Sequence, residues 1–198
     1  VTLWDWGTET DGRTDSAASD VRDATVNANG LVYGVVQPSD ILAVLDPVAH
    51  QATNITIPSD APPILARTPT SPYYGDEPIW ARQSDPRSVA MDGLGRVWLT
   101  GRVRSPEDQP AFCTDSSNAF ADYFPLDRGT RQAFVYDPDT EVFGEIDTCF
   151  SADHNQLGED ERFYYGFRDG VGWIDTEIWD ESSDSEEAQG WCPTVVDT

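Results

Sequence analysis

The chain has 198 residues and a net charge of −24, and all twelve of its basic residues are arginines. Aromatic residues make up 11% of the sequence, which excludes a disordered chain because such side chains bury much surface on folding. Nucleic acid is excluded as a partner because phosphate neutralisation needs a basic face. Membrane insertion is excluded because no apolar run approaches the about 20 residues that a membrane span needs.

The acidity itself has three interpretations. A solvated acidic surface would keep the protein soluble, and in a salty habitat ions would screen the repulsion between its carboxylates. Carboxylates could instead form sites for divalent cations, since Ca²⁺ and Mg²⁺ prefer oxygen ligands. The negative field could also attract a cationic ligand or partner.

The first copy of a repeated pattern follows an acidic and polar segment, residues 8–23, which we expect to be a loop. A turn and a strand-like run occupy residues 29–36, and a second run at 41–45 ends in Asp-Pro. In residues 51–58, isoleucines alternate with polar side chains, which is the period of a half-buried strand. The pattern predicts strands joined by tight turns, because Asp bonds the backbone beyond it and Pro presets φ.

The same order returns later in the chain. Residues 94–100 match the first element, with Gly followed by Val and an aromatic side chain, and residues 133–138 match the second and again end in Asp-Pro. Residues 142–146 match the third element. A fainter third copy covers 162–165 and 171–175. The repeat therefore predicts antiparallel meanders that follow one another along the chain.

These meanders predict an all-β fold, because one meander cannot bury both of its faces and radial stacking of several can. We expect an incomplete arc of a β-propeller, with about three four-stranded blades in a partial domain that spans residues 1–198. The blade-like repeats cover about 24–58, 88–147 and 154–180, and long loop insertions cover about 59–87 and 104–130. Both ends of the chain resemble interrupted repeats. Residues 177–189 are the best candidate for a helix.

Three cysteines are present, and none is part of a CxxC pair. Cys113 and Cys149 flank one predicted hairpin region and could form a disulfide in an oxidising compartment. Cys192 would then be free, or paired with a residue outside this chain. The alternative is three buried thiols.

A resemblance to known proteins is carried by seven segments, residues 3–7, 29–34, 44–47, 71–77, 95–100, 146–150 and 189–194. These segments resemble parts of large secreted bacterial proteins that are described as uncharacterised, NHL-type or virginiamycin-B-lyase-like propeller proteins. The resemblance implies a propeller fold and a secreted or periplasmic location, and it implies no particular reaction.

The resemblance also implies two possible site features. The family pattern has paired histidines after the position of Phe150, whereas this chain has Asp153 before His154. The family continues after residues 196–198 with a turn similar to a calcium loop, which makes Asp197 a candidate first ligand of a metal ion.

Candidate catalytic and ligand-binding residues follow from side-chain chemistry. His154 beside Asp153 could act as a general base or metal ligand, or could be a hydrogen-bonded structural histidine. Arg102 and Arg104 follow a predicted strand and could bind a carboxylate or phosphate, or could pair with acidic residues of the protein. The aromatic candidates for ligand binding are Trp98 and Tyr165, and the alternative for such side chains is the core between blades.

Asp180 and Asp184 belong to an acidic run that could hold Ca²⁺ or Mg²⁺, or could be a solvated loop. The sequence thus predicts no certain cofactor, with these two ions as candidates. It predicts a secreted propeller that acts as a binding or scaffold module for a small molecule, a glycan or a protein. The alternative is a metal-assisted enzyme of the lyase or lactonase type, with its site at the propeller axis.

Overall fold

Antiparallel β-sheets are the main secondary structure of the described residues, as the repeated pattern predicts. The structure, a computed structural model, describes residues 13–19, 30–37, 39–65, 81–115, 126, 129–167 and 170–194. Within this part of the chain, three four-stranded sheets and one two-stranded pair are present. The prediction of an all-β fold is confirmed.

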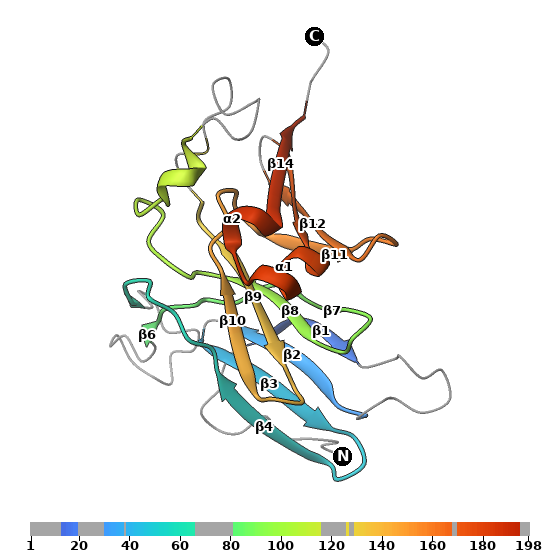
Figure 1. Cartoon of the computed structure of the whole chain (residues 1–198). Helices are drawn as coiled ribbons and strands as arrows, with labels where there is room; N and C mark the ends of the chain where they lie inside the picture. Colours follow the sequence, from blue (N-terminus) through green and yellow to red (C-terminus); the bar gives the residue numbers. More distant parts are fainter. Residues whose placement is uncertain are drawn as a thin grey trace.

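Each four-stranded sheet is a meander of consecutive strands (Figure 1). Sheet 1 contains β1 (Arg13–Ser19), β2 (Val32–Gln37), β3 (Ile41–Asp46) and β4 (Gln51–Thr56). Sheet 2 contains β7 (Val89–Met91), β8 (Val97–Gly101), β9 (Gln132–Asp137) and β10 (Val142–Ile146). Sheet 3 contains β11 (His154–Leu157), β12 (Arg162–Phe167), β13 (Gly170–Asp175) and β14 (Gln189–Pro193).

The remaining elements lie in the connections. The short strands β5 (Ile64–Leu65) and β6 (Ala81–Arg82) pair with each other in the chain segment that connects sheet 1 to sheet 2. A 3₁₀ helix (Ala111–Cys113) lies between β8 and β9. Two short helices, α1 (Thr176–Ser182) and α2 (Ser185–Ala188), connect β13 to β14. Among the described residues, no helix has the length and apolar character that crossing a membrane requires.

The repeated turn residues act as the sequence predicts. The Asp46 carboxylate accepts hydrogen bonds from the backbone N–H groups of Val48 (2.8 Å) and Ala49 (2.9 Å). Asp137 ends the matching strand of sheet 2, where its carboxylate accepts a bond from the Asp139 N–H at 2.9 Å. At the other turn of the repeat, Gly95 has a φ of +85°, which favours glycine over residues with a Cβ atom.

Sheet 2 is buried on both faces because its alternating side chains enter two different cores. One core lies between sheets 1 and 2, and the other lies between sheets 2 and 3. In β8, Val97 and Leu99 belong to the first core, and Trp98 belongs to the second. In β9, Phe134 belongs to the first core and Val135 to the second.

The three sheets follow one another in space, with sheet 2 in the middle (Figure 1). The first strand of sheet 2, β7, contacts both β1 of sheet 1 and β11 of sheet 3. Each of these three strands is the first strand of its own sheet. The sheets therefore approach one another most closely along one common side.

Two predictions about individual segments need correction. Residues 13–19 form β1, so the prediction of a loop at 8–23 is wrong in this part. The third meander continues past residue 180, because β14 pairs with β13 after the two helices. The helix predicted at 177–189 is present as two helices, separated where Ser183 adopts a left-handed φ of +53°.

Candidate functional site

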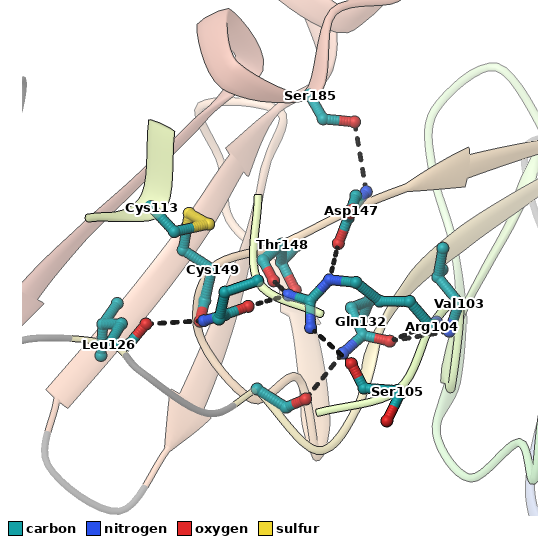
Figure 2. A network of polar contacts seen from close by, with 12 residues as sticks. Val103, Arg104, Ser105, Cys113, Leu126, Gln132, Asp147, Thr148, Cys149 and Ser185 are labelled. Atoms are coloured by element: carbon teal, nitrogen blue, oxygen red, sulfur yellow. Dashed lines mark hydrogen bonds and ion pairs between the residues drawn. A yellow bond between two sulfur atoms is a disulfide. The ribbon is translucent and has the colours of Figure 1, made fainter. Parts of the chain in front are cut away.

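Arg104 binds other groups of the protein with every nitrogen of its guanidinium group (Figure 2). Its Nε donates to the Asp147 carboxylate at 2.5 Å, and Nη1 donates to the Ser105 carbonyl at 3.1 Å. Nη2 donates to the Thr148 carbonyl at 3.0 Å and to the side chain of Gln109. Of the two predicted roles for Arg104, the geometry matches pairing within the protein.

The segment between β8 and β9 is attached by further polar contacts. Gln109 donates from Nε2 to the carbonyls of Leu126 (2.6 Å) and Cys149 (2.9 Å). A disulfide joins Cys113 to Cys149 across 36 residues, so the pairing is the one that the sequence predicts. Cys192 is a free and exposed thiol.

Arg102 also bonds to the protein, although its acceptors are carbonyls rather than carboxylates. Its Nη1 donates to the carbonyls of Pro62 and Gln83, both at 3.1 Å. Burial lowers the pKa of the Arg102 guanidinium, and the nearby Asp85 opposes this effect. Arg102 therefore fixes the connection between sheets 1 and 2 against the end of β8.

Asp85 is the centre of a buried ion-pair cluster beside Arg102. Its carboxylate lies 2.8 Å from Arg82 Nε and accepts a hydrogen bond from Arg131 Nη2 at 2.5 Å. Burial lowers the pKa of Arg131, against the attraction of Asp85. Asp153 lies farther away, with its Oδ1 atom 3.8 Å from Arg131 Nη1. The cluster links the end of sheet 2 to the residues that precede β11.

His154 and Asp153 do not form the catalytic pair that the sequence suggests. His154 begins β11 with an exposed side chain, and it lies opposite Gly166 in the sheet. Asp153 instead approaches Arg131. Within the described part of the chain, no hydrogen bond between the side chains of His154 and Asp153 is present, so the structure does not bring the two groups together as a catalytic dyad.

Trp98 and Tyr165 are core residues with no exposed surface. Trp98 stacks on Phe163 with ring centroids 4.7 Å apart, and its Nε1 donates to the Asp92 carboxylate at 2.8 Å. Burial raises the pKa of Tyr165. A ligand cannot reach either side chain without separating sheets 2 and 3, so the predicted ligand-binding role is corrected to a core role.

The candidate metal ligands also have partners of their own. Asp184 caps α2 by accepting hydrogen bonds from the N–H groups of Glu186 (2.7 Å) and Glu187 (3.3 Å). Asp180 pairs with Arg96. No group of three or more His, Cys, Asp and Glu side chains that could hold a metal ion is found among the described residues. Asp197 lies outside the described residues.

A groove of about 480 Å³ lies between β10 and α1. Within the groove, Trp179 of α1 packs closely over Gly144 of β10. A Cβ atom at position 144 would lie 3.2 Å from the indole ring. The volume is in the range of small-ligand sites. The lining residues are Arg96, Val135, Asp137, Thr140, Val142, Phe143, Gly144, Glu145, Trp179, Asp180 and Ser183.

Arg96 joins the two walls of this groove. Its Nε donates to the Asp92 carboxylate at 2.7 Å, another guanidinium nitrogen donates to Asp180, and the group lies 5.7 Å from the centre of the Trp98 ring. Burial alone would lower the pKa of Arg96, but the hydrogen bonds to Asp180 and Asp92 outweigh it, so the pKa is raised. Arg96 thus remains charged and is largely neutralised by its own partners.

Glu145 at the same groove has a different environment. Burial raises the pKa of its carboxyl group, and the carboxylates of Asp60 and Asp147 raise it further. Its charge is therefore surrounded mainly by other negative groups.

The sequence does not predict the groove, because one wall comes from sheet 2 and the other from helix α1, which follows β13 much later in the chain. No local pattern marks the groove in the sequence, since the exposure of Val142 (59%) is known only once the fold is known. Comparisons with known proteins add nothing further, because no family model and no curated protein sequence matches this chain. The resemblance to NHL-type propellers thus stays a prediction.

Proposed function

We propose that this chain is an arc of a β-propeller and that it acts as a non-catalytic binding module. The arrangement of the sheets supports the propeller, because the first strand of sheet 2 contacts the first strands of sheets 1 and 3. In a propeller, the inner strands of neighbouring blades lie side by side around the axis, and the blades bury their faces against one another. The burial of sheet 2 on both faces agrees with this arrangement.

The observation that carries the binding function is the groove between β10 and α1. Its lining combines apolar side chains, such as Phe143 and Trp179, with a few charged ones, which is the usual composition of a ligand site. In contrast, the predicted ligand-binding arginines, Arg102 and Arg104, bond to other parts of the protein. We therefore assign ligand binding to the groove rather than to these arginines.

The proposed location is a secreted or periplasmic compartment. The disulfide between Cys113 and Cys149 supports it, because disulfides persist in oxidising environments and are rare in reducing ones. The alternative function, a metal-assisted lyase or lactonase, has no comparable support. Neither an assembled His154–Asp153 pair nor a cluster of metal ligands is present in the described ranges.

Substitution of two exposed valines tests the binding site. Val142 lines the groove and is 59% exposed, whereas Val48 lies in the turn after β3 and is 85% exposed. Either valine can be changed to arginine without burying the new charge, and both changes alter the net charge equally.

The measurement is NMR of the isotope-labelled chain, titrated with a panel of sugars, amino acids and short peptides. We expect binding compounds to shift the amide signals of β10 and α1, and Val142→Arg to abolish these shifts while Val48→Arg preserves them. Shifts that cluster elsewhere, or that are the same in Val142→Arg, would contradict the assignment. The assignment would also be contradicted if no compound of the panel shifted the amide signals of β10 and α1.

A further inference from the structure

The groove follows the open edge of a strand. β10 is an outer strand of sheet 2, and it pairs with β9 on one side only within the described residues. Four consecutive residues of β10, from Val142 to Glu145, line the groove. Because neighbouring side chains of a strand point to opposite faces, such a continuous lining indicates that the groove runs along the strand edge.

An open edge of this kind presents backbone N–H and C=O groups to a partner. An extended peptide can satisfy them by pairing as an additional strand, at the usual distance of about 4.8 Å between strands. The helix α1 covers one side of the edge with Trp179 and Asp180. The groove therefore offers both backbone groups and a wall of side chains to an extended chain.

The charge around the groove selects a basic partner. Asp137, Asp180 and Glu145 contribute carboxylates to the lining, and Glu145 faces away from α1 because it neighbours Gly144, whose Cβ position faces Trp179. Among the described lining residues, Arg96 carries the positive charge and pairs with Asp180 and with Asp92, so the three carboxylates of the lining still outweigh it. The raised pKa of Glu145 agrees with this negative charge, because burial and the carboxylates of Asp60 and Asp147 raise it. The net charge of −24 adds a long-range attraction for cations.

We propose that the groove binds an extended peptide with basic side chains, which adds a strand to the edge of β10. The inference rests on the proposed binding function and specifies the partner class for the same groove. Backbone pairing would supply affinity, and the carboxylates on both faces of β10 would select arginine or lysine side chains.

The probe is a fluorescent, blocked hexapeptide of alternating arginine and valine, and its binding to the full chain is measured by fluorescence anisotropy. The matched probes are a peptide with glutamate in place of arginine, and a basic peptide N-methylated at alternate residues along one backbone edge. Arginine amide serves as a competitor that carries the positive charge but is too short to pair with β10 as a strand. The protein variants are Val142→Arg, Glu145→Gln and the control Val48→Arg.

We expect the basic peptide to bind at least about tenfold more tightly than the acidic peptide, because like charges oppose the acidic one. Val142→Arg should weaken binding about tenfold, Glu145→Gln should weaken it by a smaller factor, and Val48→Arg should leave it unchanged. N-methylation along the bonding edge should abolish binding, since it removes the backbone donors and crowds the strand.

Three results would overturn the inference. Equal binding to Val142→Arg and Val48→Arg would mean that the peptide is attracted by the acidic surface in general. If the N-methylated peptide bound as tightly as the unmodified basic peptide, backbone pairing would not contribute to binding. If arginine amide competed at concentrations similar to those of the peptide, the groove would bind a small cation rather than a strand. If the compound panel maps to β10 and α1 while the basic peptide does not bind, the peptide inference fails and the proposed binding function stands.

Discussion

Single arginine side chains connect segments that are far apart in this sequence. Arg104 lies shortly after β8 and binds residues that follow β10, the Asp147 carboxylate and the carbonyl of Thr148. A guanidinium group suits this role because it presents five N–H donors in a fixed plane and is always charged. A lysine could not replace it, since an ammonium group cannot donate in several fixed directions at once.

Replacement of Arg104 by alanine should lower the free energy of unfolding by about 2–4 kcal/mol. The change leaves a carbonyl and an amide without their donor and leaves Asp147 without its cation. The Asp147 side chain keeps 32% of its surface exposed, so water compensates for part of the loss. Urea denaturation measures the effect.

The matched control is Arg162→Ala. Arg162 also forms ion pairs, with Asp160 and Asp175, but 43% of its side chain is exposed. Its removal should cost less than about 1 kcal/mol, because solvent screens exposed pairs. Equal losses for the two variants would mean that the buried contacts of Arg104 contribute no more than a surface pair.

At the scale of elements, the long connection between β8 and β9 is fixed to the fold by the disulfide. Cys113 lies at the end of the 3₁₀ helix and is fully buried, as is Cys149. The bond closes a loop of 36 residues in the unfolded chain as well as in the folded one. Cross-links of this kind stabilise mainly by reducing the freedom of the unfolded state.

Replacement of both Cys113 and Cys149 by alanine should therefore lower the free energy of unfolding by about 3–4 kcal/mol, as expected for a loop of this length. The loss is measured by urea denaturation of the oxidised parent and the double variant. Cys192→Ala is the control, because this thiol is free and exposed, and it should change stability by less than about 0.5 kcal/mol. A double variant as stable as the control would contradict a structural role for the bond.

The elements differ in how well the sequence predicts them. β3 and β9 follow from apolar runs that end in Asp46 and Asp137, because the turn chemistry is local. β1 and β14 were missed, since β1 consists of small and polar residues and β14 begins with Gln-Gly. Both are strands because a neighbouring strand pairs with them, which is a tertiary effect that overrides local propensity.

The candidate site was less predictable than the fold. Arg102 and Arg104 stood out in the sequence as possible anion ligands, but their acceptors come from segments up to about 45 residues away, and no local pattern reveals such contacts. The groove depends on the approach of α1 to β10, and Trp179 is far from Gly144 in the sequence. Only the packing of sheets 2 and 3 brings these residues together.

At the scale of the whole molecule, the packing between sheets 2 and 3 depends on close contacts at glycines. Gly172 of β13 lies directly against the ring of Phe150, and a Cβ atom at this position would be 2.5 Å from two of the ring carbons. Phe150 is itself fixed in the core between the two sheets. A larger residue at position 172 would therefore push the ring into its neighbours.

Gly172→Ala should lower the free energy of unfolding by about 1–3 kcal/mol, which is the usual cost of overpacking a core. Gly166→Ala is the control, because Gly166 lies on the neighbouring strand β12 and a Cβ atom there meets nothing within 4 Å. The control should be neutral or slightly stabilising, since alanine has less freedom than glycine in the unfolded chain. Thermal and urea denaturation compare the two, and equal stability would contradict the close packing.

The position of sheet 2 between two cores has a consequence for partial opening of the structure. Sheets 1 and 3 each share one core with sheet 2, so either outer sheet could detach while the other core stays intact. The amides of β8 and β9 can exchange with solvent only after contacts on both faces are lost, whereas those of outer strands need to lose fewer contacts. Deuterium uptake should therefore proceed from both ends of the stack toward the middle, and the central strands should exchange last.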